Sequence, residues 1–227
     1  MAATGVDLFK DPFHNICGTE CNQELAVAFH GNDKCTHPIL YYYVRSITNW
    51  GKVSKGNTLV KEFQKAADEW HCHTNIRFVR VFLNESRYHT EDDLVIDAPH
   101  FVIRSANRDE EDEKKTWIAS AFFWSSLNEK RVVVWGKINQ VHAYTVFLHE
   151  IGHILGFRHE HVFLSAADRT AFSETKEKPD GYLLLQDAVD KDSIMSYEYL
   201  KDKIHDPHGE GGHLSSTDIL QARNYYT

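Results

Sequence analysis

The hydrophobic residues of this chain recur with two different periods, and each period predicts a type of element. Residues 39–46 and 76–83 are rich in aromatic and β-branched side chains, so both are predicted to be strands. Between them, apolar positions at helical spacing predict a helix that is capped by Asn57 or Thr58 and ends near His71. The predicted buried face of this helix consists of Leu59, Phe63, Ala66, Ala67 and Trp70.

Three further apolar runs follow in the middle of the chain. Residues 94–103 predict a strand in which Pro99 requires an edge position or a bulge. Residues 117–124 and 131–135 predict two more strands, and the charged run 109–115 is predicted to be a solvated loop. The order up to this point is therefore strand, helix and four strands.

A second helix and a loop-rich tail complete the chain. Residues 160–227 contain Pro179 and the glycine-rich stretch 209–212, so they are predicted to be rich in loops. The second helix is predicted from an apolar stripe that consists of Val141, Tyr144, Leu148, Ile151 and Leu155.

The composition limits the architecture and the partners. A chain of 227 residues, 42% of them hydrophobic, can bury the core of one domain, which a cleft can divide. No apolar run reaches the ~20 residues that cross a membrane, and residues 1–16 lack the pattern of a signal peptide. The net charge of −8 argues against nucleic acid as a main partner. We therefore expect a monomer with no nucleic-acid or membrane partner.

All cysteines lie in the first third of the chain, at Cys17, Cys21, Cys35 and Cys72. An even number is consistent with one or two disulfides in an exported protein, so the chain is expected to be secreted, and three pairings are open. Two alternatives remain. Cys17, Cys21, Cys35 and His37 would form a second metal site, or the thiolate of Cys17 or Cys21 would block a catalytic metal.

A histidine-rich run in the second predicted helix carries the most chemical information. His149 and His153 are four residues apart, so they face the same way on a helix, and Glu150 lies beside the first. Gly156 can adopt the left-handed conformation that ends a helix, which returns His159 to the other histidines. Three imidazoles, an open position for water and a nearby carboxylate are what a hydrolytic zinc site requires.

A motif of this length rarely arises by chance. A His-Glu-x-x-His pattern arises by chance in roughly 7% of chains of this composition, and requiring Gly156 and His159 as well lowers the expectation to roughly 2 in 10,000. The sequence therefore predicts one catalytic Zn²⁺ bound by His149, His153 and His159.

The extended motif resembles that of the metzincins, a clan of zinc endopeptidases. A second mark of this clan is a methionine-containing turn beneath the metal, and residues 192–197, with Met195, look like that turn. Glu160 directly after the third histidine, and Tyr197 two residues after Met195, make the chain similar to astacins. The Ser-Ile-Met-Ser-Tyr form is also similar to serralysins, which usually carry proline where Glu160 stands.

The close resemblance covers about residues 131–226 and implies an α+β, metzincin-like fold. That fold has a twisted five-stranded mixed sheet, two long helices above the cleft, and a loop-rich lower half that ends in a C-terminal helix. The catalytic domain would span 39–227, with the cleft between 39–159 and 160–227. Residues 1–38 would form an irregular N-terminal segment that wraps the domain or keeps it latent.

The resemblance also implies how a substrate binds. The fourth strand would be antiparallel and lie at the sheet edge above the zinc. A protein or peptide substrate would pair with it in extended form through main-chain hydrogen bonds. In this chain the substrate-binding edge corresponds to Trp117, Ile118, Ala119, Ser120, Ala121 and Phe122.

The implied activity is that of a zinc metalloendopeptidase. Glu150 would act as the general base for a zinc-activated water, and Tyr197 would donate a hydrogen bond to the oxyanion. Met195 would form a hydrophobic floor under the histidines. The alternatives are a catalytically inactive zinc-bearing binding protein, a narrow-specificity protease toxin or effector, and a purely structural role for Tyr197.

The chain departs from typical astacins in two ways. No cysteine follows Cys72, and nothing identifies a processed amino terminus that would pair with Glu160. Arg158 or Arg169 is therefore an alternative partner for Glu160. Residues 205–213 contain three histidines and are interpreted as a polar loop, with a second zinc or a calcium site as the alternative.

Overall fold

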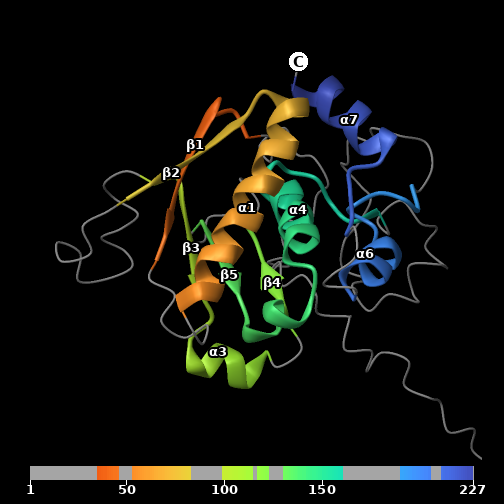
Figure 1. Ribbon diagram of the computed structural model, residues 1–227. Coiled ribbons are helices and arrows are strands. Elements are labelled where there is room, and N and C mark those ends of the chain that lie inside the picture. The colour runs from red at the N-terminus through yellow and green to blue at the C-terminus, as the bar shows by residue number, and fades with distance from the viewer. Residues whose placement is uncertain are drawn as a thin grey trace, which may run out of the picture.

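The protein has an α+β fold built on a five-stranded mixed sheet, as predicted (Figure 1). The sheet and its helices enclose one main hydrophobic core. The computed structural model describes residues 35–45, 53–82, 99–114, 117–122, 130–160, 190–205 and 211–226, with all their side chains except those of 53–58 and 140.

The five strands lie in the order β2-β1-β3-β5-β4. β1 (Ile39–Val44) pairs in parallel with both β2 (Arg77–Val81) and β3 (Phe101–Ser105), and β3 pairs in parallel with β5 (Arg131–Val134). β4 (Ala119–Ser120) is antiparallel to β5 and occupies the edge, as predicted for the segment that contains it. Aligned pairs are Leu40 with Phe78, Tyr43 with Val102, Ile103 with Val132, and Ala119 with Val134.

Two helices lie side by side over the sheet (Figure 1). They are α1 (Val53–Thr74) and α4 (Ala143–Ile154). Trp70 on α1 is fully buried, and its indole N–H donates to the carbonyl oxygen of Leu148 on α4 at 2.8 Å. This buried bond and the surrounding apolar packing fix where α4 lies, and α4 carries the histidine motif.

The predicted start of α1 is wrong. The helix begins at Val53, so Asn57 and Thr58 lie inside it rather than at its cap. The helix is held by the packing of its later turns, from Leu59 to Trp70, all of whose inward residues are buried. Packing of these later turns stabilises the helix, so its beginning did not depend on the capping signal at Asn57 or Thr58.

The charged run 109–115 was predicted to be a loop, but most of it belongs to a short helix, α3 (Arg108–Glu113). Asn107 and Glu110 form a reciprocal capping box, in which the Asn107 side chain accepts from the Glu110 N–H at 2.9 Å. The Glu110 carboxylate accepts from the Asn107 N–H at 2.7 Å. Local capping therefore stabilises a helix in this polar run, although none of the helix residues is buried.

The C-terminal part contains one helix that was predicted and one that was not. α7 (Ser216–Tyr226) matches the predicted final helix, whereas α6 (Tyr197–Ile204) was not foreseen. α6 is held against α4 by Leu200 and Ile204, which are fully buried. No helix within the described residues is both long and apolar enough to span a bilayer.

The two described cysteines carry free thiols. Burial raises the pKa of the Cys35 thiol to about 11, against the smaller opposing effect of its bond to the His37 carbonyl. Cys72 is exposed. The described residues therefore give no support to the predicted disulfides. Cys17 and Cys21, with the second metal site and the thiolate block that involve them, lie outside the described residues.

Candidate metal centre

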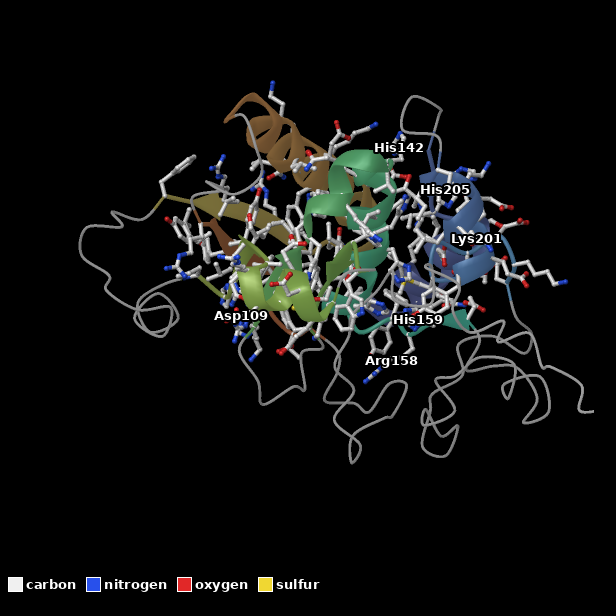
Figure 2. The ribbon with its side chains drawn as sticks, turned by 90° about the horizontal axis from the view of Figure 1, so that it is seen from below. Asp109, His142, Arg158, His159, Lys201 and His205 are labelled. Carbon is white, nitrogen blue, oxygen red and sulfur yellow. The ribbon has the colours of Figure 1, made fainter. Side chains whose placement is uncertain are left out.

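Three histidines meet at the end of α4, as the sequence predicted. His149 and His153 project from the same side of the helix. Gly156 follows with a φ of 99°, in the left-handed region that glycine adopts without strain. There the Phe157 N–H donates back to the Gly152 carbonyl at 2.8 Å, which reverses the chain. His159 thereby returns to the other two rings, near α4 and the C-terminal helices and away from Asp109 on α3 (Figure 2).

The three imidazoles converge through their Nε2 atoms. The Nε2 of His159 lies 3.3 Å from that of His149 and 3.0 Å from that of His153. All three residues are at most 1% exposed. Of the described residues, these three are the single group of histidine, cysteine or carboxylate side chains close enough together to hold a metal ion.

Backbone carbonyls orient two of the rings. His149 Nδ1 lies 2.8 Å from the Ile194 carbonyl oxygen, and His153 Nδ1 lies 2.8 Å from that of Phe157. A carbonyl oxygen only accepts, so in each ring Nδ1 carries the proton and Nε2 presents its lone pair. Burial, and then the neighbouring imidazoles, lower the pKa of His153 well below its usual range. The Nε2 atoms of His149 and His153 therefore both face the Nε2 atom of His159.

This arrangement fits zinc. Nitrogen ligands at 2.0–2.1 Å around a tetrahedral zinc lie roughly 3.3 Å from each other, close to the separations of 3.0 and 3.3 Å in this cluster. Unprotonated Nε2 atoms repel each other at such distances, and a cation between them removes that repulsion. The donor set of three imidazoles also suits zinc.

Met195 lies against the histidine helix at Gly152. A Cβ built on Gly152 would lie 2.5 Å from the Met195 sulfur, so the thioether occupies the space that a side chain would need. Met195 is 2% exposed. The glycine inside the motif is therefore required for this close approach of the two segments.

Tyr197 contacts two rings of the histidine cluster, and Glu150 is next in sequence to one of the three histidines. Tyr197 is the first residue of α6, and its ring centroid is 4.3 Å from that of His159 and 6.3 Å from that of His149. Glu150 is fully buried and follows His149 in α4. Their catalytic roles remain predictions, because ring contact and burial do not test proton transfer.

Glu160 has a described partner that the sequence did not suggest. Its carboxylate accepts from the backbone N–H of Asp190 at 2.9 Å, and its own N–H donates to the Met195 carbonyl at 3.1 Å. Glu160 is 3% exposed. Of the two predicted partners, Arg169 lies outside the described residues. Glu160 thus joins the end of the histidine motif to the methionine turn.

The predicted substrate-binding edge is a strand only at Ala119–Ser120. Ile118, Ala119, Ala121 and Phe122 are buried, so these side chains belong to the core. The backbone of β4 still forms the edge of the sheet. Peptide binding there remains a prediction.

The stretch 205–213 contains three histidines, and its described residues are 205 and 211–213. These residues do not belong to a second metal-binding cluster. His213 Nδ1 lies 3.1 Å from the Tyr199 hydroxyl, and His208 lies outside the described residues. The Gly212 N–H donates to Thr145 Oγ1 on α4 at 2.7 Å. This end of the stretch is therefore fixed to the histidine helix rather than being a free polar loop.

Sequence reasoning missed Asp218, which lies in the first turn of α7 and is 4% exposed. Its carboxylate accepts from Ser193 Oγ at 2.6 Å and from the N–H groups of Ile194 and Ser215, both at 2.9 Å. Burial raises the pKa of Asp218, and these hydrogen bonds oppose that effect. An aspartate near a helix start looks like an ordinary cap, so the sequence held no signal for its contact with the methionine turn.

Comparisons with known proteins give a likeness of fold. One solved structure of myroilysin matches with a TM-score of 0.54 and 15% identity, covering 88% of this chain and 97% of that chain. A second myroilysin structure matches with a TM-score of 0.53 and 15% identity, covering 93% and 90%. No protein-family profile and no curated protein sequence matches. At this identity the likeness shows the fold alone.

Proposed function

We propose that this chain is a zinc-dependent endopeptidase of the metzincin clan, with astacin-like features at the metal site. The observation that carries the proposal is the buried convergence of three Nε2 atoms from His149, His153 and His159. The shared fold with myroilysin supports it at the level of architecture. Placement of Met195 under the helix and of Tyr197 beside the rings adds support for the clan.

The three histidines would hold the metal as neutral ligands. When bound, zinc supplies Lewis acidity that makes a water a stronger acid and polarises the carbonyl of the scissile peptide bond. The Ile194 and Phe157 carbonyls keep the His149 and His153 rings in the tautomer that binds metal through Nε2. The low pKa of His153 keeps that ring unprotonated near neutral pH.

Two further side chains would move or hold protons. Glu150 takes the proton from the attacking water and passes it to the leaving amine, so the carboxylate is regenerated at the end of each cycle. Tyr197 donates a hydrogen bond from its hydroxyl to the carbonyl oxygen as negative charge develops there. An extended peptide paired with the backbone of β4 would present the scissile bond to these groups.

The remaining features of the proposal concern the whole chain. The catalytic domain would comprise residues 39–227, with the cleft between 39–159 and 160–227 and with 1–38 as an added segment. We propose that the chain is secreted and acts as a monomer on protein or peptide substrates.

The test combines metal analysis with a cleavage assay. Wild-type protein should bind zinc and cleave casein, and a chelator should stop the cleavage. Glu150→Gln should retain zinc and lose cleavage, because an amide cannot accept the proton of water. Glu113→Gln, at an exposed residue of α3, should keep both properties and serves as the matched control.

Each other outcome contradicts a definite part of the proposal. Failure of the wild type to bind zinc contradicts the metal site, and substantial cleavage by Glu150→Gln contradicts the general base. Zinc binding without casein cleavage favours the inactive binding protein or the narrow-specificity protease. A proteome-wide cleavage profile of wild type against Glu150→Gln separates those two, because the binding protein produces no new termini.

A further inference from the structure

We propose that Asp218 is a positioning residue for the metal site, acting on His149 through the methionine turn at Ser193, Ile194 and Met195. The inference rests on the proposed zinc site and adds a residue from a distant helix to it. Asp218 does not touch the histidines. Its effect is transmitted by hydrogen bonds from the carboxylate to the methionine turn and from the turn to His149.

The first bond anchors the methionine turn to α7. Asp218 Oδ2 accepts from the Ile194 N–H at 2.9 Å, and Asp218 Oδ1 accepts from Ser193 Oγ at 2.6 Å. Ser193 Oγ in turn accepts from the Met195 N–H at 3.0 Å. One carboxylate therefore fixes three successive residues of the turn, Ser193, Ile194 and Met195.

The second bond leads from the turn to the metal ligand. The carbonyl oxygen of Ile194 accepts from His149 Nδ1 at 2.8 Å. The same residue thus receives a bond from the ligand at its oxygen and gives one to Asp218 at its nitrogen. The N–H in the same peptide group as this carbonyl is that of Met195, which donates to Ser193 Oγ, and Ser193 Oγ donates to Asp218. Hydrogen bonding at the N–H of an amide makes its carbonyl oxygen a stronger acceptor, so these bonds reinforce the one from His149.

The surroundings favour transmission of this effect. His149, Ile194 and Ser193 are fully buried and Asp218 is 4% exposed, so water does not screen the interaction. The negative carboxylate of Asp218 accepts from Ser193 Oγ, which accepts from the Met195 N–H, so it strengthens the pull of the Ile194 carbonyl on the His149 Nδ1 proton. This raises the basicity of Nε2 toward a metal and fixes the orientation of the ring.

His149 needs such support more than His153 does. The acceptor for His153 is the carbonyl of Phe157, four residues away in the same turn of chain, so helix termination itself supplies it. The acceptor for His149 is 45 residues away in sequence. The position of the Ile194 carbonyl depends on the contacts that hold the methionine turn. Asp218 forms hydrogen bonds to that turn directly.

Asp218 also bonds the start of α7, so a capping role must be separated from a positioning role. Its Oδ2 accepts from the Ser215 N–H at 2.9 Å, and its own N–H donates to Ser215 Oγ at 2.9 Å. Ser215→Ala removes the capping hydroxyl and leaves the carboxylate at Ile194 in place. It is therefore the matched control for a loss of helix capping.

The experiment compares the wild type with Asp218→Ala, Asp218→Asn and Ser215→Ala. Zinc affinity is measured by competition with a chromophoric chelator, and the visible absorption spectrum of the cobalt-substituted protein reports ligand geometry. Asp218→Ala should raise the zinc dissociation constant by about 10- to 100-fold, the usual effect of removing such an outer partner, and should alter the cobalt spectrum. Asp218→Asn keeps an oxygen acceptor for the Ile194 N–H and should restore most of the affinity. Ser215→Ala should bind zinc like the wild type.

The outcomes that overturn the inference differ from those that overturn the proposed function. Equal zinc affinity and equal cobalt spectra in Asp218→Ala and Ser215→Ala overturn the positioning role while the zinc site stands. A wild type that binds no zinc overturns both.

A second measurement decides the case in which Asp218→Ala does not fold. In protein labelled with ¹⁵N at histidine, the His149 Nδ1 proton of Asp218→Asn should resonate upfield of the wild type, because the neutral amide polarises the Ser193 hydroxyl, and through it the Ile194–Met195 peptide, less. Ser215→Ala should leave that resonance in place. An unmoved resonance in Asp218→Asn contradicts the inference.

Discussion

The sulfur of Met195 occupies the position that a side chain at Gly152 would need, since a Cβ on Gly152 would lie 2.5 Å from Sδ and 3.4 Å from Trp70 Cζ2. Gly152 is one of the two unspecified positions between the histidines of the motif. The methionine turn and the histidine helix are therefore in contact through the helix backbone itself, without an intervening side chain.

Gly152→Ala should destabilise the protein by about 1–3 kcal/mol, because the added methyl group over-packs a buried contact. The free energy of unfolding from denaturant titration measures this effect. Gly136→Ala is the matched control, since the nearest atom to its Cβ would be Glu111 Oε1 at 3.6 Å, an ordinary contact. Similar destabilisation in both variants would show that loss of glycine, rather than contact with Met195, is the cause.

Glu110→Gln should lower the free energy of unfolding near neutral pH. It should also make that free energy fall less steeply as the pH is lowered into the acid range. The Glu110 carboxylate accepts two hydrogen bonds from Arg104, at 2.6 and 2.7 Å, and one from the Asn107 N–H. Burial acts to raise the pKa of Glu110, but these bonds and the charges of Arg104 and Arg131 outweigh it and hold the pKa below 4.5. The stabilisation is therefore present above pH 4.5 and is lost as the pH falls through the lower folded-state pKa.

Denaturant titrations at several pH values measure this difference. At pH 7 the Glu110→Gln variant should be less stable by about 2 kcal/mol, the scale of hydrogen bonds to a charged group, and the gap should narrow below pH 4. Glu113→Gln, at an exposed position of the same helix, should change stability by no more than about 0.5 kcal/mol. A gap for Glu110→Gln that is constant with pH would contradict the assignment to the ionised carboxylate.

Tyr197→Phe should lower kcat by about one to two orders of magnitude with a smaller change in KM, if the hydroxyl stabilises the oxyanion. The ring contact with His159 is retained in this variant, because phenylalanine preserves the aromatic ring whose centroid lies 4.3 Å away. Steady-state kinetics on a peptide substrate measure both constants. A larger change in KM than in kcat would identify Tyr197 as a binding or structural residue.

The local pattern of the chain predicted the histidine cluster correctly. His149 and His153 converge because helical geometry places residues four apart on one face. His159 joins them because the glycine at 156 permits a positive φ that returns the chain. The strands were also predicted in the right order along the chain, since apolar runs of strand length are a local signal. The third was misplaced, because β3 begins at Phe101, after Pro99, and lies inside the sheet rather than at its edge.

Other elements were decided by contacts that no sequence window contains. The start of α1 was misplaced because packing stabilises that helix, and α6 was missed because its support comes from α4. α3 was misread even though its capping box is local, because the dense charge of the run masked the capping signal.

The sequence by itself thus determined which three imidazoles meet and which carboxylate follows the first of them, because those relations span only a turn or two of helix. Only the tertiary structure decided what holds them. It placed Met195 against Gly152, Tyr197 against His159, and Asp218 on the turn whose Ile194 carbonyl bonds His149. These partners lie far apart in sequence, and burial in a common core is what makes their hydrogen bonds and contacts specific.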